Sequence, residues 1–268
     1  MRPNKKISSL KNPQVKKIGL LRDKKTRHVS GTILVEGLRE VLRAWEAKLP
    51  FQELYVCREL IGTKDNEVVQ NIIRNLPIKL TETSKKVFEK IAFGDRREGI
   101  IAVCQKPQLT LNDLKLSDRP FLVVVEKIEK PGNLGAILRT CDAAGVDGLI
   151  LCESKVDLYN PNVVRASVGC VFCVKVMETS NTEALAFLRK NQAVICAATP
   201  QAKTPYTQTT MKGPLAIAIG SEDEGLSPFW LQNADMQVKI PMLGKADSLN
   251  ASASSAILIY EALRQRSS

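Results

Sequence analysis

Histidine is nearly absent from this chain of 268 residues, which contains only His28. A Ser/His/Asp or Cys/His hydrolase needs a histidine beside its nucleophile, and His28 lies in a basic N-terminal segment without such a partner. The seven cysteines are an odd number, and the one CxxC pair, Cys170 and Cys173, lacks the second pair or the histidines that a zinc site requires. We therefore expect no metal site and no hydrolase of these types. The cysteines are interpreted as reduced core residues of a cytoplasmic protein.

Long apolar runs and the common nucleotide fingerprints are also missing. No run approaches the roughly 18 apolar residues of a membrane span, and no secretory signal is recognisable. No GxxxxGK[ST] motif occurs, and the glycines between residues 132 and 148 do not form GxGxxG between a strand and a helix. These absences disfavour a membrane protein, a P-loop NTPase and a dinucleotide-dependent enzyme.

Positive charge is abundant and unevenly placed. The formal net charge is +11, and residues 1–28 hold ten lysine or arginine side chains against one acid, Asp23. A protein this basic usually binds a polyanion, most often nucleic acid. Apolar residues recur in this segment at gaps of three to five, which favours a helix packed on a domain with its basic side outward over a solvated charge run or a transit peptide. The side chains expected to contact RNA are Lys16, Lys17, Arg22, Lys24, Lys25 and Arg27.

Strand-like and helical patterns alternate along the chain, which predicts an α/β fold. The first half is expected to form a small α/β unit with strands at 32–36, 54–57, 78–80 and 99–104 and helices at 37–48, 67–75 and 84–92. Residues 107–119 are polar and lack periodicity, which is typical of a linker. The expected division is therefore 1–106, linker 107–119, and 120–268.

The second half shows a sharper alternation. Strands are expected at 121–125, 148–152, 171–176, 193–198, 215–219 and 236–240, and helices at 134–144, 183–190, from about 226, and at 252–266. Strands such as LAIAI are apolar throughout, which is typical of a parallel sheet covered on both faces.

Three segments rich in glycine, asparagine and small residues follow strands of this second half, where open α/β sheets bind their ligands. They are EKPGNLGAILRTCDAAG (129–145), GSEDEGLSP (220–228) and PMLGKADSLNASASSA (241–256). Each alone is compatible with an ordinary helix start, in which Asn133, for example, is a cap. Arg139 is less ordinary, because it lies in an otherwise small and apolar helix.

Together and in this order, the three segments resemble the motifs of the SPOUT superfamily, specifically the TrmH-like (SpoU) RNA 2′-O-ribose methyltransferases of the ribosomal RNA branch. VEGLREVL, residues 35–42, is similar to the family's opening segment, so the resemblance covers nearly the whole chain. It implies a trefoil-knotted parallel-sheet domain at 120–268, a smaller N-terminal α/β RNA-binding domain, an obligate homodimer and S-adenosylmethionine as cofactor. The implied reaction is methyl transfer to a ribose 2′-hydroxyl of RNA, with large-subunit (23S-type) ribosomal RNA as the expected substrate.

The family's pattern carries over to particular residues of this sequence. The implied catalytic residues are Asn133, Arg139, Glu222, Ser248 and Asn250. The implied cofactor-binding residues are Thr199, Gly220, Ile240 and Leu249. The implied further RNA contacts are Arg165 and Ser167. Departures from the pattern are Lys130, where relatives often carry an acid, and Ala251 and Ala253, where a bulkier residue is common.

The implied reaction is an in-line displacement, so the protein must align two reactants and help the hydroxyl lose its proton. Because a guanidinium stays protonated at neutral pH, we interpret Arg139 as electrostatic help rather than as a base, with Glu222 holding Arg139 or a loop of the knot. The alternatives are a transfer RNA ribose methyltransferase, a base methyltransferase on the same fold and a non-catalytic RNA-binding assembly factor. The separate front domain favours ribosomal RNA, and the presence of Arg139, Ser248 and Asn250 together favours a working enzyme.

Overall fold

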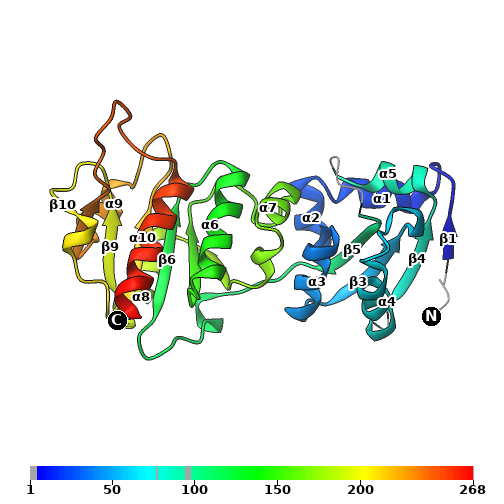
Figure 1. The fold of residues 1–268 in the computed structure, drawn as a ribbon, viewed down its shortest axis with the longest axis horizontal. Helices are drawn as coiled ribbons and strands as arrows, with labels where there is room; N and C mark the ends of the chain where they lie inside the picture. The colour runs from blue at the N-terminus through cyan, green and yellow to red at the C-terminus, as the bar shows by residue number, and fades with distance from the viewer. Residues whose placement is uncertain (1–4, 77, 94–97, 268) are drawn as a thin grey trace. The chain divides into compact units, whose positions relative to one another are not determined.

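The structure is a computed structural model that describes residues 5–76, 78–93 and 98–267, so Arg2 of the basic segment lies outside it. The chain forms two compact units (Figure 1). The first comprises residues 1–108 and 158–173, and the second comprises 109–157 and 174–268. The chain first crosses from the first unit to the second between Gln108 and Leu109, which lie within the expected linker 107–119. Residues 158–173, expected in the second domain, group instead with the first unit.

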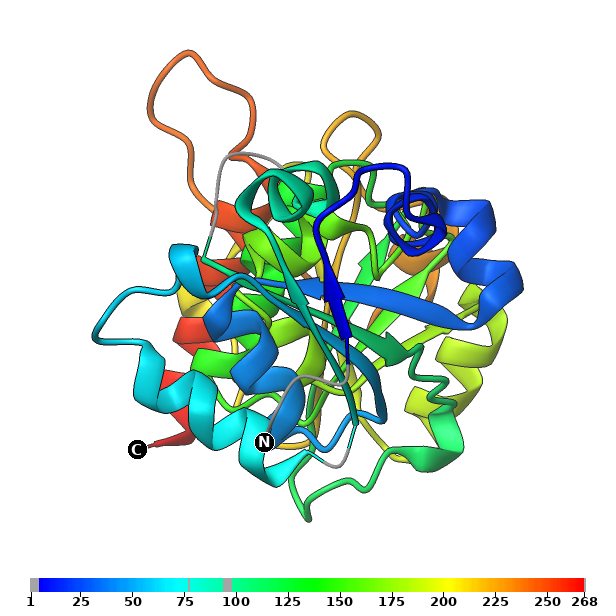
Figure 2. The ribbon, with the colours of Figure 1, turned by 90° about the vertical axis from the view of Figure 1, so that its right-hand side faces the viewer.

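The first unit contains a five-stranded mixed sheet in the order β1-β4-β3-β5-β2. Its strands are β1 (Lys5–Ile7), β2 (Thr32–Glu36), β3 (Phe51–Val56), β4 (Lys79–Thr83) and β5 (Ile100–Gln105). The strands β1, β4 and β3 are parallel to one another, whereas β5 runs antiparallel to both β3 and β2. Figure 2 shows β1, in dark blue, lying along this sheet.

Helices surround this sheet. They are α1 (Pro13–Leu20), α2 (Lys24–Ser30), α3 (Leu38–Glu46), α4 (Asn66–Asn75), α5 (Lys85–Ile91) and α7 (Pro161–Ala166), with short 3-10 helices at Arg58–Leu60 and Cys170–Phe172. The basic segment was expected to be helical, but only part of it is. Ile7 is buried on strand β1, whereas Val15 and Ile18 are buried on helix α1. The amide of Asn12 starts α1 by accepting a hydrogen bond from the backbone N–H of Gln14 at 2.9 Å.

The second unit is built on a seven-stranded, fully parallel sheet in the order β10-β12-β9-β11-β6-β7-β8. Its strands are β6 (Phe121–Glu126), β7 (Gly148–Cys152), β8 (Val176–Thr179), β9 (Val194–Ala198), β10 (Thr204–Pro205), β11 (Leu215–Ile219) and β12 (Met236–Lys239). Every residue of β6, β7 and β11 is buried, as predicted for a parallel sheet covered on both faces.

The α-helices described in this unit are α6 (Pro131–Ala143), α8 (Asn181–Lys190), α9 (Pro228–Asn233) and α10 (Ala251–Arg266), with short 3-10 helices at Leu111–Asp113 and Tyr206–Gln208. The helices α6 and α10 run side by side (Figure 1), although they are more than a hundred residues apart in the sequence. On α8 and α9, Leu188 and Trp230 join the same core cluster as Leu122 of β6. No helix among the described residues is long and apolar enough to cross a membrane.

One predicted strand, 171–176, is wrong. The chain there forms the short helix α7, a left-handed turn at Val168 (φ 52°) and Gly169 (φ 81°), and the 3-10 helix Cys170–Phe172, and only Val176 begins strand β8. The apolar residues that suggested a strand are buried in this compact turn, so burial rather than β-propensity explains their composition.

Candidate active site

A cavity of about 580 Å³ lies where three loops leave the carboxyl ends of β9, β11 and β12. Thr199, Gly220, Ile240 and Leu249, which were expected to bind the cofactor, all line it. These residues come from widely separated segments, and parallel strands bring them together because their carboxyl ends meet at one edge of the sheet.

The loop after β11 approaches the cavity through its backbone. Ser221 and Gly225 donate backbone hydrogen bonds to each other's carbonyls at 3.2 and 3.1 Å, which closes the loop into a tight turn. A Cβ at Gly220 would lie 1.9 Å from the carbonyl carbon of Gly225. Only glycine therefore fits at position 220, because any larger residue would collide with the backbone of this turn.

The cavity suits the cofactor implied by the resemblance. Its volume lies in the range of small-molecule sites, and Leu226, Ile240 and Leu249 supply apolar walls for a flat heterocycle. Glu222, Asp223, Glu224 and Asp247 also line it. These carboxylates favour a cationic ligand group such as a sulfonium or an ammonium.

A polar cluster is centred on Glu222, which lines the cavity and has a side chain that is 15% exposed. Its carboxylate accepts hydrogen bonds from Asn133 of α6 and from Asn250, the latter at 2.7 Å, and forms an ion pair with Lys130. The hydrogen bond to Glu222, together with its charge, raises the pKa of Lys130 above its usual value. The carboxylate thus joins the first, second and third motif segments.

Asn250 is fixed in two ways. Its side-chain oxygen accepts hydrogen bonds from the backbone N–H and the hydroxyl of Ser252, which makes it the N-cap of α10. Its amide nitrogen donates to Glu222 and, at 3.2 Å, to the side-chain oxygen of Asn133. The capping role and the predicted catalytic role therefore reside in one side chain.

The other two predicted catalytic residues lie apart from the cluster. Ser248 is exposed and lines the cavity. Arg139 is exposed on α6, about 9 Å along the helix axis from Asn133, and no hydrogen bond or ion pair joins it to another described residue. Glu222 was expected to hold Arg139 or a loop of the knot. Among the described residues it makes no contact with Arg139, but it binds Asn133, Lys130 and Asn250 of the loop before α10, as the second alternative expects.

The basic segment divides into exposed and structural cations. Lys16 and Lys17 are exposed on α1, and Lys24 and Lys25 are exposed on α2. Arg27, predicted as an RNA contact, is only 2% exposed.

One predicted RNA contact of this segment, Arg27, is wrong, and a second, Arg22, also supports the fold. The guanidinium of Arg27 donates to the carbonyls of Leu21 and Arg22 at 2.8 and 2.6 Å, so Arg27 supports the chain and cannot reach RNA. Arg22 donates to the carbonyls of Lys90 and Ala92 but is half-exposed, so it stays a predicted RNA contact.

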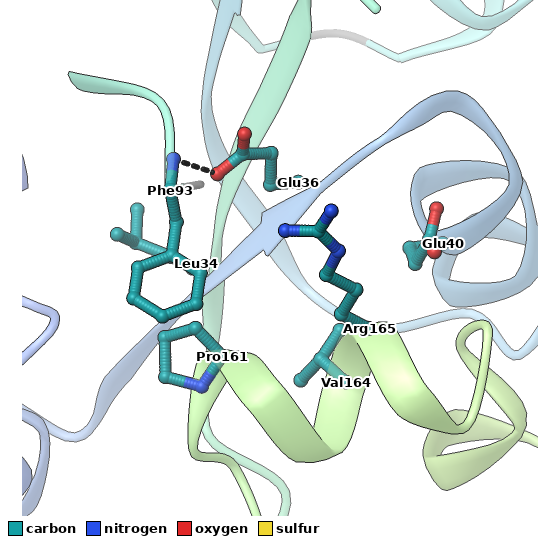
Figure 3. A pocket seen from close by; sticks show the side chains of 7 residues that line it. All are labelled: Leu34, Glu36, Glu40, Phe93, Pro161, Val164 and Arg165. Carbon is teal, nitrogen blue, oxygen red and sulfur yellow. Dashed lines mark hydrogen bonds between the residues drawn. The ribbon is translucent and has the colours of Figure 1, made fainter. Parts of the chain in front are cut away.

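Ser167 differs from its predicted role, whereas the half-exposed Arg165 stays a predicted RNA contact. Ser167 is fully buried, and its hydroxyl donates to the carbonyl of Val164 at 3.0 Å, so the RNA contact expected of it is wrong. Arg165 lines a small cavity of the first unit and points between Glu36 and Glu40 (Figure 3). Its other walls are Leu34, Phe93, Pro161 and Val164.

Glu36 is a largely buried titratable group, and the effect of pH on its charge is testable. Burial raises its pKa to about 7, although a hydrogen bond from the backbone N–H of Phe93 and the charges of Arg22 and Arg165 oppose the rise. In the unfolded chain this carboxyl titrates near 4.5. Protons are therefore bound more tightly by the folded state, and stability should fall as the pH rises from about 4.5 to about 7.

We expect Glu36→Gln to remove this decline, which amounts to roughly 1–2 kcal/mol after allowance for the partial exposure of the group. Urea denaturation at pH 5 and pH 7.5 measures it. Glu46→Gln, an exposed change on α3, should leave the pH dependence as it is in the wild type. An unchanged slope in Glu36→Gln would mean that Glu36 ionises normally in the folded protein.

Sequence reasoning missed two groups at or near the site. Lys130 was noted only as a departure from the family pattern, and Glu126, at the end of the apolar strand β6, was not noted at all. A charged residue closing a fully apolar strand is a usable signal, because a buried carboxylate requires partners.

The chain is similar to known proteins over nearly its whole length. The profile of the SpoU rRNA Methylase family matches residues 120–260, and that of the MRM3-like substrate binding domain matches residues 12–102. The chain is 28% identical over 256 residues to the 23S rRNA (guanosine(2553)-2'-O)-methyltransferase RlmP of Bacillus subtilis (strain 168), with 96% of this chain and 98% of that protein covered.

Two solved structures are similar as well. A crystal structure of an RNA 2'-O ribose methyltransferase has a TM-score of 0.86 at 38% identity and covers 98% of this chain and 100% of its own. The AdoMet-bound rRNA methyltransferase from Sinorhizobium meliloti has a TM-score of 0.87 at 27% identity, with 97% of both chains covered. Both likenesses extend through the two units.

Proposed function

The chain belongs to the SpoU rRNA methylase family, and we infer that it transfers a methyl group from S-adenosylmethionine to a ribose 2′-hydroxyl of ribosomal RNA. One observation of the structure carries this inference. The four positions expected to bind the cofactor line a single cavity, and Glu222 belongs both to that cavity and to the asparagine cluster beside it. Large-subunit ribosomal RNA is the substrate we propose.

When bound, S-adenosylmethionine supplies an electrophilic methyl group. The chain itself must place the ribose hydroxyl in line with that group and ease the loss of its proton. We propose that Glu222, by accepting hydrogen bonds from Asn133 and Asn250, holds these amides at the cavity edge where the ribose binds. The exposed hydroxyl of Ser248 lines the same edge and is proposed to help orient the acceptor.

Arg139 has a different proposed role. Because a guanidinium keeps its proton, it cannot serve as an efficient base at neutral pH. Its charge, unpaired among the described residues, is suited to binding a backbone phosphate and stabilising the alkoxide that develops on the ribose.

We propose a homodimer in the cytoplasm. The helix α10 carries the half-exposed Tyr260 (49%) on the same side as the partly exposed Ile257 and Leu263, an apolar stripe that a second copy would cover. Light scattering should then give twice the chain mass of 29.6 kDa, whereas a single-chain mass would contradict the dimer.

The exposed lysines of α1 and α2 are proposed to bind RNA phosphates. Changing Lys16, Lys17, Lys24 and Lys25 to glutamine should weaken RNA binding about tenfold or more and lower the slope of log affinity against log salt by roughly 3, since each lost phosphate contact removes about 0.7 to 0.9 from it. Filter binding between 50 and 200 mM salt measures both quantities.

The matched control for this prediction has the same change of charge elsewhere on the first unit. It replaces the exposed side chains of Lys48, Lys64, Arg74 and Lys79 with glutamine. Equal losses in the two variants would show that net charge, and not the α1–α2 surface, determines RNA affinity.

Methyl transfer from labelled S-adenosylmethionine to ribosomal and transfer RNA tests the function directly. We expect label in large-subunit ribosomal RNA at a linkage that resists alkali, since a methylated 2′-hydroxyl cannot attack the neighbouring phosphate. Label confined to transfer RNA would favour the transfer RNA enzyme. An alkali-labile labelled site would favour base methylation, and cofactor binding without any transfer would favour an assembly factor.

A further inference from the structure

Glu126 is the most deeply buried acid of the second unit. It is the last residue of β6, it is 0% exposed, and three hydrogen bonds converge on its carboxylate. The backbone N–H and the hydroxyl of Ser227 each donate to it at 2.7 Å, and the amide of Asn181 donates at 2.8 Å. All three partners are donors, as a carboxylate requires.

The contacts continue beyond this carboxylate. The side-chain oxygen of Asn181, the first residue of α8, accepts a hydrogen bond from the indole N–H of Trp230 at 2.8 Å. Trp230 lies fully buried in α9. One acid thus connects the end of β6 with the starts of α8 and α9.

Ser227 connects the hydrogen bonds of Glu126 to the cavity. The loop 220–226 leaves β11 at Ile219, which pairs with Val125 of β6. The loop ends at Ser227, which is bound by Glu126, the next residue of β6. Every residue of that loop lines the cofactor cavity, so the loop begins and ends against two adjacent residues of one buried strand.

We propose that Glu126 is a positioning residue that holds the loop 220–226 in its cofactor-binding conformation before the cofactor arrives. The inference rests on the proposed function, because it concerns the site assigned there to S-adenosylmethionine. Glu126 does not line the cavity and acts only through Ser227. Its effect is to reduce the ordering that the loop must undergo on binding.

Glu126→Gln is the sharpest single change. Glutamine keeps the shape of the side chain but replaces one carboxylate oxygen, an acceptor, with an NH₂ group, a donor. That NH₂ group then faces Ser227 or Asn181, which are themselves donors to this site, so a hydrogen bond is lost. We expect the dissociation constant for S-adenosylmethionine, measured by calorimetry without RNA, to rise about 10- to 100-fold. The kcat at saturating cofactor should stay within about threefold of wild type, so the effect appears in KM.

Hydrogen exchange of the cofactor-free protein supplies a readout independent of binding. The amides of residues 221–226 should exchange at least tenfold faster in Glu126→Gln than in the wild type, while those of β11 keep their protection. Ser227→Ala, which removes only the hydroxyl donor, is a milder variant that retains the backbone hydrogen bond. It should shift affinity and exchange in the same direction by about threefold.

The double variant Glu126→Gln with Asn181→Asp exchanges the donor and acceptor roles of the pair. The new amide can donate to the new carboxylate, which still accepts from Trp230, so affinity should return to within about threefold of wild type. Asp235→Asn is the control, because Asp235 binds the backbone N–H of Ile195 at the opposite end of β9. It should lower thermal stability and leave cofactor affinity unchanged.

The outcomes separate this inference from the proposed function. A folded Glu126→Gln protein with wild-type affinity and wild-type exchange would overturn the positioning role, as would an equal loss of affinity in Asp235→Asn. A wild-type protein that binds no S-adenosylmethionine would instead overturn the proposed function itself.

Discussion

Arg139→Ala should lower kcat for methyl transfer about 100- to 1,000-fold while leaving the affinity for S-adenosylmethionine unchanged. Alanine removes the positive charge that, beside the bound RNA, is proposed to stabilise the negative charge developing on the ribose oxygen. Cofactor affinity should not change, because Arg139 does not line the cofactor cavity. Single-turnover methyl transfer at saturating RNA, with calorimetry for the cofactor, measures both effects.

Arg139→Lys distinguishes geometry from charge. Lysine keeps the positive charge but not the planar fork that binds two phosphate oxygens at once, so we expect most of the loss to remain. Near-normal turnover in Arg139→Lys with unchanged cofactor binding would contradict the assignment. The exposed change Lys190→Ala on α8 serves as the control for a general loss of positive charge.

Gly220→Ala should weaken S-adenosylmethionine binding at least 100-fold and abolish turnover at ordinary cofactor concentrations. The added methyl would lie 1.9 Å from the carbonyl carbon and 2.1 Å from the oxygen of Gly225, both of them backbone atoms. A backbone neighbour cannot rotate away as a side chain can, so the turn between Ser221 and Gly225 must open. Calorimetry without RNA measures the affinity.

Gly244→Ala is the matched control for this prediction. It lies in the loop that precedes α10, and a Cβ there meets nothing within 4 Å. Its cofactor affinity should equal that of the wild type. Retention of normal affinity in a folded Gly220→Ala protein would show that the turn after β11 does not form part of the cofactor site.

Much of the fold could be predicted from local patterns. The strands at 32–36, 148–152 and 215–219 have the predicted bounds, because each has a buried apolar centre and turn residues on either side. The segment 171–176 was mispredicted, because an apolar run buried in a turn has the same composition as one buried in a strand. The two-residue strand β10 was missed, since its pairing with β12 involves only two residues.

The candidate site was predictable as a set of residues but not as a set of contacts. The three motif segments identified Asn133, Glu222 and Asn250, yet their joining through one carboxylate depends on loops that are distant in sequence. Arg27 and Ser167 were predicted as RNA contacts from charge and motif, and both are buried. Burial of a polar side chain depends on what packs over it, which no local pattern records.

The class of this protein can be read from its amino-acid sequence alone. The order and spacing of its three loop motifs, the apolar parallel strands and the basic N-terminal segment are linear properties, and they identified the family, the cofactor and the kind of substrate. Which polar groups meet depends on the folded chain. In the folded chain Glu222 pairs with Lys130 and not with Arg139, Arg27 is buried, and Glu126 binds Ser227 at the end of the loop 220–226. The reason is that hydrogen bonds and desolvation act over a few ångströms, and only the folded chain brings such distant residues within that range.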